Sequence, residues 1–440
     1  MRHPYDLGFY SDTCGRIGSL MTNGVIPVIA GDSISVNADH IFRLSPIKRQ
    51  LLHDAQVDLF AFFVPFRHIY GQDWIDLIHQ GMDSGAVSLD TVSPGLGGTS
   101  YTGQSLPNAS GAVAKWIYGG YNHIWNWFFR FVKLTSVEVP LDYNGVGYPT
   151  GHNSGNSPID GSQPVKDHGF PCARLKRPWT TGIVTDIVSG DHEVSAATVL
   201  DLIDLAKQKQ IFKTQLQRDY FAYHYKDVIK ELFGGAVSTD AAGDERPTLI
   251  MRKKFSLAGR DIDGSDDAAL GTSVSKSLSR FNFNFRRRFI PEHGAVYLQT
   301  LVRFPTIMAE ELIPQLKGSQ NYLRLSGDPA LASVQEPLIT NTDEWFTNSG
   351  TTSLGTIPFG QMWRTQPNFV HENYKTALGF QFLTEAEVDT HREAVYHDPN
   401  DYDNMFSSTQ LGHWQAQSTI QVEAMRNYPT AVSSIMAGTK

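Results

Sequence analysis

Two acidic clusters are the residues whose types and spacing come closest to a metal site. One contains Asp261 and Asp263, and the other contains Asp401 and Asp403. A hard cation such as Ca²⁺ needs several oxygen ligands from one loop, but neither cluster has the glycine and the closing glutamate of an EF-hand. Carboxylates in such positions also form turns. We therefore expect turns that bind Ca²⁺ with at most roughly millimolar affinity, and no other cofactor.

Three basic clusters could contact nucleic acid. They are Arg252-Lys253-Lys254, Arg286-Arg287-Arg288 and the segment from Arg174 to Arg177, which lies close to Trp179. Lysine and arginine can bind phosphates while a neighbouring aromatic ring stacks on a base of single-stranded nucleic acid. Solvated strand ends, or salt bridges across a subunit contact, are the alternative and the commoner use of such clusters. The residues of the first two clusters are the candidate nucleic-acid contacts.

Motifs for enzymatic chemistry are incomplete. The glycine-rich segments 95–98 and 145–147 do not complete a dinucleotide-binding or phosphate-loop pattern. His371-Glu372 has no second histidine one helical turn later, and Gly151 to Gly155 lacks the spacing of a nucleophile elbow. The sequence therefore predicts a protein that is not an enzyme.

Composition limits the possible functions further. The 440 residues carry a formal net charge of −8, so the chain cannot coat nucleic acid through overall basicity, and any contact must be local. Cys14 and Cys172 are too far apart in sequence for a zinc motif or a disulfide framework. The longest apolar run, Leu59 to Val64, is too short to cross a membrane. We expect a chain without membrane insertion.

Strands must form the framework that positions these residues. Apolar and polar residues alternate most clearly at 281–289 and 295–304, on either side of a Pro/Gly turn. We expect these runs to be two strands of a sheet with one buried side. The same pattern predicts further strands at 34–44, 248–252 and 414–424, and a mostly apolar run ended by Pro65 predicts another at 57–64.

Helical spacing separates the groups of predicted strands. It appears at Trp74, Leu77 and Ile78, again after Ser195, and from Phe221 to Leu232. The final strand could not be stable alone, so it must join the earlier ones. We predict one domain, 1–440, with an all-β sandwich core and two large mixed helix and loop insertions at about 65–245 and 305–413.

The aromatic block from Trp116 to Phe129 is denser than a single small helix needs for burial. Such density could line a sugar site, form the core of an insertion or make an inter-subunit contact. Packing is the commoner use of these side chains. We take packing as the working interpretation.

Many collinear segments resemble the major capsid proteins of the Microviridae, small bacteriophages with circular single-stranded DNA. They include 27–32, 43–46, 57–60, 68–71, 218–221, 233–235, 261–264, 291–294, 301–305, 327–329 and 401–403. The resemblance implies an eight-stranded antiparallel jelly roll that forms pentamers and then a T=1 icosahedral shell around the DNA. It also implies a spike protein, a small basic DNA-packaging protein and scaffolding proteins as partners, and outer loops that contact host lipopolysaccharide.

On this interpretation the chain belongs to the virion capsid and assembles in the cytoplasm of a bacterial host. The alternative is a carbohydrate-binding or glycan-cleaving β-sandwich protein, which the aromatic block and the scattered aspartates suggest. A glycosidase needs two carboxylates across a cleft, and sequence alone does not place such a pair.

Overall fold

The computed structural model describes the strands of the core and part of what surrounds them. The described residues are 3–47, 53–80, 89–92, 113–130, 139–142, 246–257, 278–304, 338–340, 353–356, 371, 373, 402–403, 405–406 and 411–426. The helices predicted after Ser195 and at 221–232 lie outside them, as does the basic cluster at 174–177.

The first sheet, called sheet 1, unites the two ends of the chain. Its strands run antiparallel in the order β1-β13-β4-β9, and β2 also pairs with β13. The strands are β1 His3–Asp6, β2 Phe9–Gly15, β4 Ser33–Leu44, β9 Ser279–Phe289 and β13 Trp414–Arg426. The last strand therefore lies inside the sheet, between β4 and the amino-terminal strands. This confirms that it joins the earlier strands.

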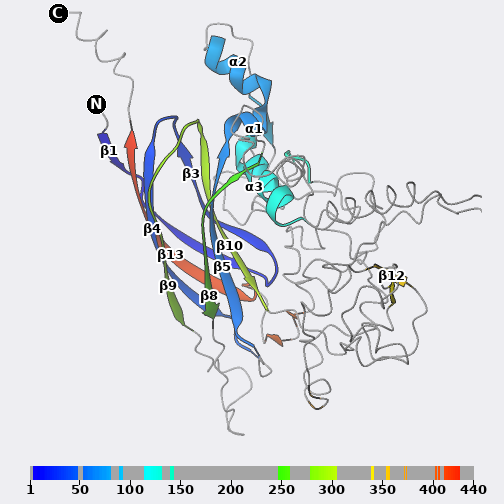
Figure 1. Cartoon of the computed structure of the whole chain (residues 1–440). Coiled ribbons are helices and arrows are strands. Elements are labelled where there is room, and N and C mark those ends of the chain that lie inside the picture. Colours follow the sequence, from blue (N-terminus) through cyan, green and yellow to red (C-terminus); the bar gives the residue numbers. More distant parts are fainter. Residues whose placement is uncertain are drawn as a thin grey trace, which may run out of the picture.

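The second sheet, called sheet 2, packs against the first. Its order is β3-β10-β5-β8, and all pairs are antiparallel. The strands are β3 Leu20–Val28, β5 Ala55–Pro65, β8 Thr248–Leu257 and β10 Gly294–Arg303. Figure 1 shows the two sheets as adjacent layers. The predicted all-β core of antiparallel sheets is confirmed.

Helices cover only one side of this sandwich among the described residues. α1 and α3 lie beside sheet 2, on the side away from sheet 1, and α2 extends past the end of the sandwich (Figure 1). The helices are α1 Phe66–Tyr70, α2 Gln72–Gln80 and α3 Lys115–Phe128. Two small ladders complete the described elements, β6 Thr91–Val92 with β7 Val113–Ala114, and β11 Leu338–Thr340 with β12 Ser353–Thr356. No helix in these described segments is long and apolar enough to span a membrane.

The main core lies between the sheets because each strand alternates its side chains. On β4, the buried residues Ile34, Val36, Ala38 and Phe42 share one face and meet Val57 and Leu59 of β5 in the same cluster. Burial of one such large aliphatic or aromatic side chain contributes about 1.5–3 kcal/mol. The interior is therefore specified by period-two patterning on sheet 1, and by the nearly continuous buried strands β5 and β10 on sheet 2.

His40 of β4 is buried in this core. His40 is 2% exposed and its Nδ1 lies 2.6 Å from the Ser418 hydroxyl of β13. Burial lowers the pKa of His40 to about 4, although the neighbouring Asp39 carboxylate acts in the opposite direction. The imidazole is therefore neutral at pH 7.

A second core forms where α3 packs on the outer face of sheet 2. Tyr121 and Trp125 of α3 are fully buried in one cluster with Phe62 of β5 and Tyr297 of β10. The Tyr297 hydroxyl donates a hydrogen bond to the Trp116 carbonyl at 2.6 Å. This confirms packing as the use of the aromatic block and removes the main reason to place a sugar site there.

The predicted arrangement of 281–289 and 295–304 is correct in that β9 buries one side, but it is wrong about their pairing and about the burial of β10. β9 pairs with β4 in sheet 1, whereas β10 pairs with β3 and β5 in sheet 2. β10 is also buried at every position, because sheet 1 covers one face and α3 covers part of the other. The Pro/Gly turn therefore connects the two layers.

Candidate nucleic-acid interface

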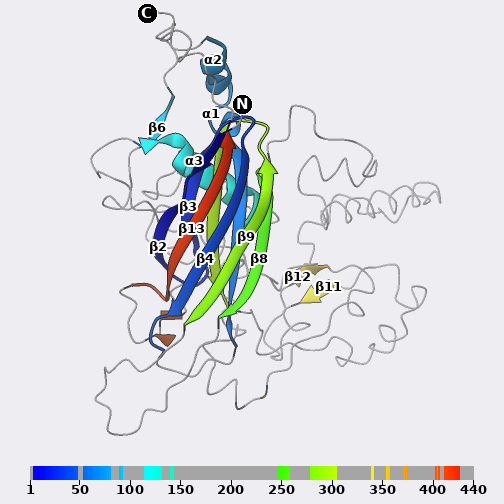
Figure 2. The same cartoon turned by 90° about the vertical axis from the view of Figure 1, so that its left-hand side faces the viewer.

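The outer face of sheet 1 is polar. Because alternate residues of its strands point into the core, the intervening ones point away from it. Figure 2 looks onto this face, with β13, β4 and β9 side by side. The outward positions include Ser35, Asn37, Asp39, Arg280, Asn282, Asn284, Gln417, Gln421 and Glu423.

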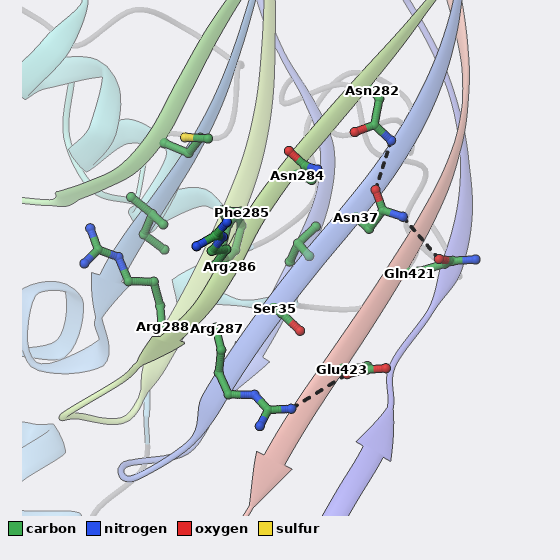
Figure 3. Close-up of a pocket in the computed structure, with 13 residues that line it drawn as sticks. Ser35, Asn37, Asn282, Asn284, Phe285, Arg286, Arg287, Arg288, Gln421 and Glu423 are labelled. Carbon is green, nitrogen blue, oxygen red and sulfur yellow. Dashed lines mark hydrogen bonds and ion pairs between the residues drawn. The ribbon is translucent and has the colours of Figure 1, made fainter.

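Amide side chains form a hydrogen-bonded row across these strands. The Asn282 amide donates to Asn37 Oδ1 at 2.9 Å and to Asp39 Oδ1 at 3.0 Å. Asn37 in turn donates to Gln421 Oε1 at 3.4 Å (Figure 3). Amides both donate and accept, so such a row can bind phosphate oxygens as well as base edges.

Asp39 keeps its negative charge in this row. The hydrogen bond from Asn282 lowers the pKa of Asp39, and the Arg280 guanidinium, 3.3 Å from Oδ2, lowers it further. Desolvation acts against them. Arg280 therefore offsets the charge of the carboxylate.

A β-bulge changes the direction of the arginine triplet. Val36 pairs with Phe285 and Ile34 pairs with Arg288, so Arg286 and Arg287 lie opposite Ser35 alone. The Arg287 guanidinium extends past Ser35 and lies 3.8 Å from the Glu423 carboxylate, whereas Arg288 points away from Glu423 (Figure 3). These residues and the amides line a groove of about 1080 Å³ that also reaches Ile250 of β8.

The other predicted basic cluster is divided between two faces of β8. Lys253 points toward β9, where its Nζ donates to Asn284 Oδ1 at 2.7 Å. Arg252 binds the buried Asp58 carboxylate at 3.2 Å and its guanidinium lies over the Phe60 ring. Lys254 is exposed and makes no ion pair with a described residue. Lys253 and Arg287 therefore share the amide face, and Arg252 does not.

Arg252 belongs to a structural charge cluster. Asp58 is completely buried and also binds Arg303 at 2.5 Å, an arginine that is itself 6% exposed. A buried carboxylate is stable only when partners of opposite charge surround it.

Asp403, one of the predicted metal ligands, is bound to protein groups. His413 Nδ1 accepts a hydrogen bond from the Ile17 amide at 3.1 Å, so its Nε2 carries the proton and donates to Asp403 Oδ1 at 2.6 Å. Arg16 lies 3.6 Å from the other oxygen. Asp261, Asp263 and Asp401 lie outside the described residues, which contain no group of three side chains able to hold a metal.

The amide row and Arg280 are the part of this face that motif analysis missed. Their signal was present in the alternation Arg280-x-Asn282-x-Asn284 and in the matching polar positions of 35–39 and 417–423. Single strands show which residues point outward, but only pairing of β9, β4 and β13 places these amides in one row.

Comparison with known proteins gives a consistent result over the whole chain. The model of the family described as Capsid protein (F protein) matches residues 1–182 and 190–436. Capsid protein F of Escherichia phage G4 is 33% identical over 439 residues, covering 99% of this chain and 97% of that protein. The corresponding protein of Enterobacteria phage phiK is 33% identical over 442 residues, and that of Escherichia phage alpha3 is 31% identical over 441, with the same coverage.

These relatives are structural capsid proteins and not enzymes, which agrees with the absence of complete catalytic motifs in the sequence. A capsid role also places the chain in an oligomeric shell of the virion. The chain belongs to the capsid protein (F protein) family of the Microviridae and is a major capsid protein of a bacteriophage.

Proposed function

We propose that this protein is a jelly-roll subunit that assembles through pentamers into a T=1 icosahedral shell around circular single-stranded DNA. The observation that carries the proposal is the way the chain alternates between the sheets. β3, β5, β8 and β10 belong to sheet 2, while β1, β2, β4, β9 and β13 belong to sheet 1, so the chain changes sheets at each step along these strands except from β1 to β2 and from β5 to β8. An eight-stranded jelly roll has this alternation.

The count of eight strands treats β1 and β2 as one interrupted strand. Both pair with β13 in one continuous register, from His3 opposite Arg426 to Gly15 opposite Trp414. The Leu7 amide, between the two strands, also donates to the Val422 carbonyl at 2.8 Å. On this proposal residues 1–440 are one domain, and the regions at about 65–245 and 305–413 are insertions that supply contact area and outer surface.

Packaged DNA contacts the amide face of sheet 1 in this proposal. Lys253 provides positive charge there, Arg280 and Arg287 offset the carboxylates of Asp39 and Glu423, and the amide row provides donors and acceptors. An overall charge of −8 requires such contacts to be local. The small basic packaging protein that the family resemblance implies would neutralise the remaining phosphates.

The other partners in this proposal rest on the family resemblance. They are a spike protein, scaffolding proteins and host lipopolysaccharide, the last contacted by outer loops. Assembly takes place in the cytoplasm of the bacterial host. The weak Ca²⁺ site at Asp261, Asp263, Asp401 and Asp403 stays a prediction, and one oxygen of Asp403 is already hydrogen-bonded to His413.

Electron microscopy tests the assembly. The chain is expressed with the scaffolding proteins of its phage, and we expect small round shells of uniform diameter, with pentameric rings as intermediates. A protein that stays monomeric under these conditions, although its tertiary structure is intact, would contradict the proposal.

DNA retention tests the amide face. We expect Lys253→Gln with Arg287→Gln to weaken binding of single-stranded DNA and to reduce the slope of log K against log salt by about 1.4, the value for two phosphate contacts. Arg43→Gln with Lys254→Gln removes the same charge from exposed positions outside the groove and should change the slope less. Arg43 also lies on the outer face of sheet 1, so equal slopes for the two variants would rule out the groove as the contact.

A further inference from the structure

α2 exposes apolar and acidic side chains at the end of the sandwich. Trp74 anchors the helix by packing on Phe66. Ile75 is 39% exposed and Ile78 is 56% exposed. Asp73 is exposed and makes no ion pair with a described residue, and Asp76 accepts a hydrogen bond from Gln72 within the helix. The helix thus presents uncovered isoleucines together with two negative charges.

A second surface has the opposite charge. We call it the arginine edge, and it consists of Leu249, Arg286, Arg288 and Phe289 at the neighbouring ends of β8 and β9. Phe289 is 58% exposed and Leu249 is 39% exposed. Arg286 and Arg288 are exposed and make no ion pair with a described residue, whereas Arg287 pairs with Glu423. Arginine next to exposed aromatic and aliphatic groups is typical of the centre of a protein interface.

The two surfaces carry opposite charges, so each is complementary to the other but not to a second copy of itself. A two-fold contact of α2 with α2, or of one arginine edge with another, would bring like charges together. A contact of α2 with the arginine edge joins opposite charges and covers apolar side chains on both sides. Such a contact is heterologous, and contacts of this kind close rings when the rotation between subunits is suitable.

We propose that α2 of one subunit docks on the arginine edge of a second copy of this chain. This inference rests on the proposed shell function and specifies one of its subunit contacts. It assigns Arg286 and Arg288 to protein contact and leaves Arg287 and Lys253 on the amide face. The alternative use of these arginines, binding of DNA phosphates, is an outcome that the tests distinguish.

Disulfide cross-linking in assembled particles tests the contact. In a background with Cys14→Ser and Cys172→Ser, the pair Asp73→Cys and Arg288→Cys is introduced, and particles are oxidised before non-reducing electrophoresis. We expect dimers and a ladder up to rings. The control pair Asp12→Cys and Arg288→Cys combines the same edge with an exposed position on β2 and should leave monomers.

The outcomes separate this inference from the shell proposal. Particles that form normally but yield only monomers, or a cross-link within one chain, would overturn the contact and leave the shell intact. Failure of the cysteine-free parent to form particles would instead count against the shell.

Charge reversal provides a second test. Asp73→Lys with Asp76→Lys, or Arg286→Glu with Arg288→Glu, should reduce the yield of rings by about tenfold or more, because like charges then face each other. Combining both pairs in one chain should restore assembly, since each contact again joins opposite charges. A DNA role for the arginines predicts no such restoration, and that result would overturn the proposal.

Discussion

Gly120 is the position where the packing of α3 on sheet 2 can be tested most directly. A Cβ at this position would overlap the Tyr297 hydroxyl and its ring, with the Cε2 atom only 2.7 Å away. Tyr297 cannot yield easily, because it is fully buried and its hydroxyl donates to the Trp116 carbonyl. We predict that Gly120→Ala destabilises the subunit.

The magnitude follows from opposing effects. Alanine is favoured over glycine in a helix by about 1 kcal/mol. Overpacking costs about 1–3 kcal/mol, and a displaced Tyr297 hydroxyl that loses its partner costs about 1–3 kcal/mol more. The free energy of unfolding should therefore fall by roughly 1–5 kcal/mol, although helix propensity alone predicts a gain.

Urea unfolding of the isolated subunit, followed by tryptophan fluorescence, measures this change. Gly119→Ala is the matched control. Its Cβ would meet a methyl group of Ile69 at 2.7 Å, a side chain without a polar tether, so we expect a smaller loss. Tyr297→Leu removes the obstructing ring, and the double variant with Gly120→Ala should lose less than the sum of the single losses by about 1 kcal/mol. A Gly120→Ala protein as stable as its parent would refute the contact.

Three further predictions concern buried ionisable groups. The pKa of His40 in the folded state is about 4, below its ordinary 6.5, so its contribution to stability is complete above pH 6.5 and is lost as the pH falls toward 4, by about 3 kcal/mol. The free energy of unfolding, measured across this pH range, should depend less steeply on pH for His40→Gln than for the parent. An unchanged pH dependence would contradict the lowered pKa of His40. Asp58→Ala leaves Arg303 buried without its carboxylate and should cost about 3–5 kcal/mol in urea unfolding, whereas exposed Asp12→Ala should cost little. Arg426→Ala should lower the thermal midpoint by several degrees, since it leaves the buried Asp32 carboxylate without its guanidinium. Arg426→Lys keeps a positive charge and should lose less. Equal midpoints for the alanine and lysine variants would argue against this ion pair.

The sequence located six of the nine strands described in the two sheets, without β1, β2 and β3, and it predicted strand partners poorly. Alternation at 34–44, 248–252 and 414–424 located β4, part of β8 and β13, and the apolar run at 57–64 located β5. The same alternation suggested that 281–289 and 295–304 shared a sheet with one buried side. One-sided burial is correct for β9, but the shared sheet and the one-sided burial of β10 were wrong. A hydrophobic pattern records which side of a strand is buried, but the backbone hydrogen bonds that pair strands are common to all residues.

In the candidate site, too, the sequence indicated which residues matter but not what surrounds them. Residue types alone marked the basic clusters at 252–254 and 286–288, because charge is a property of the local sequence. Only the tertiary structure decided that Arg252 neutralises a buried carboxylate, that Lys253 and Arg287 join the amide row, and that a bulge directs Arg288 elsewhere. The function of a charged side chain depends on which groups surround it, and here those groups come from strands that lie far apart in the chain.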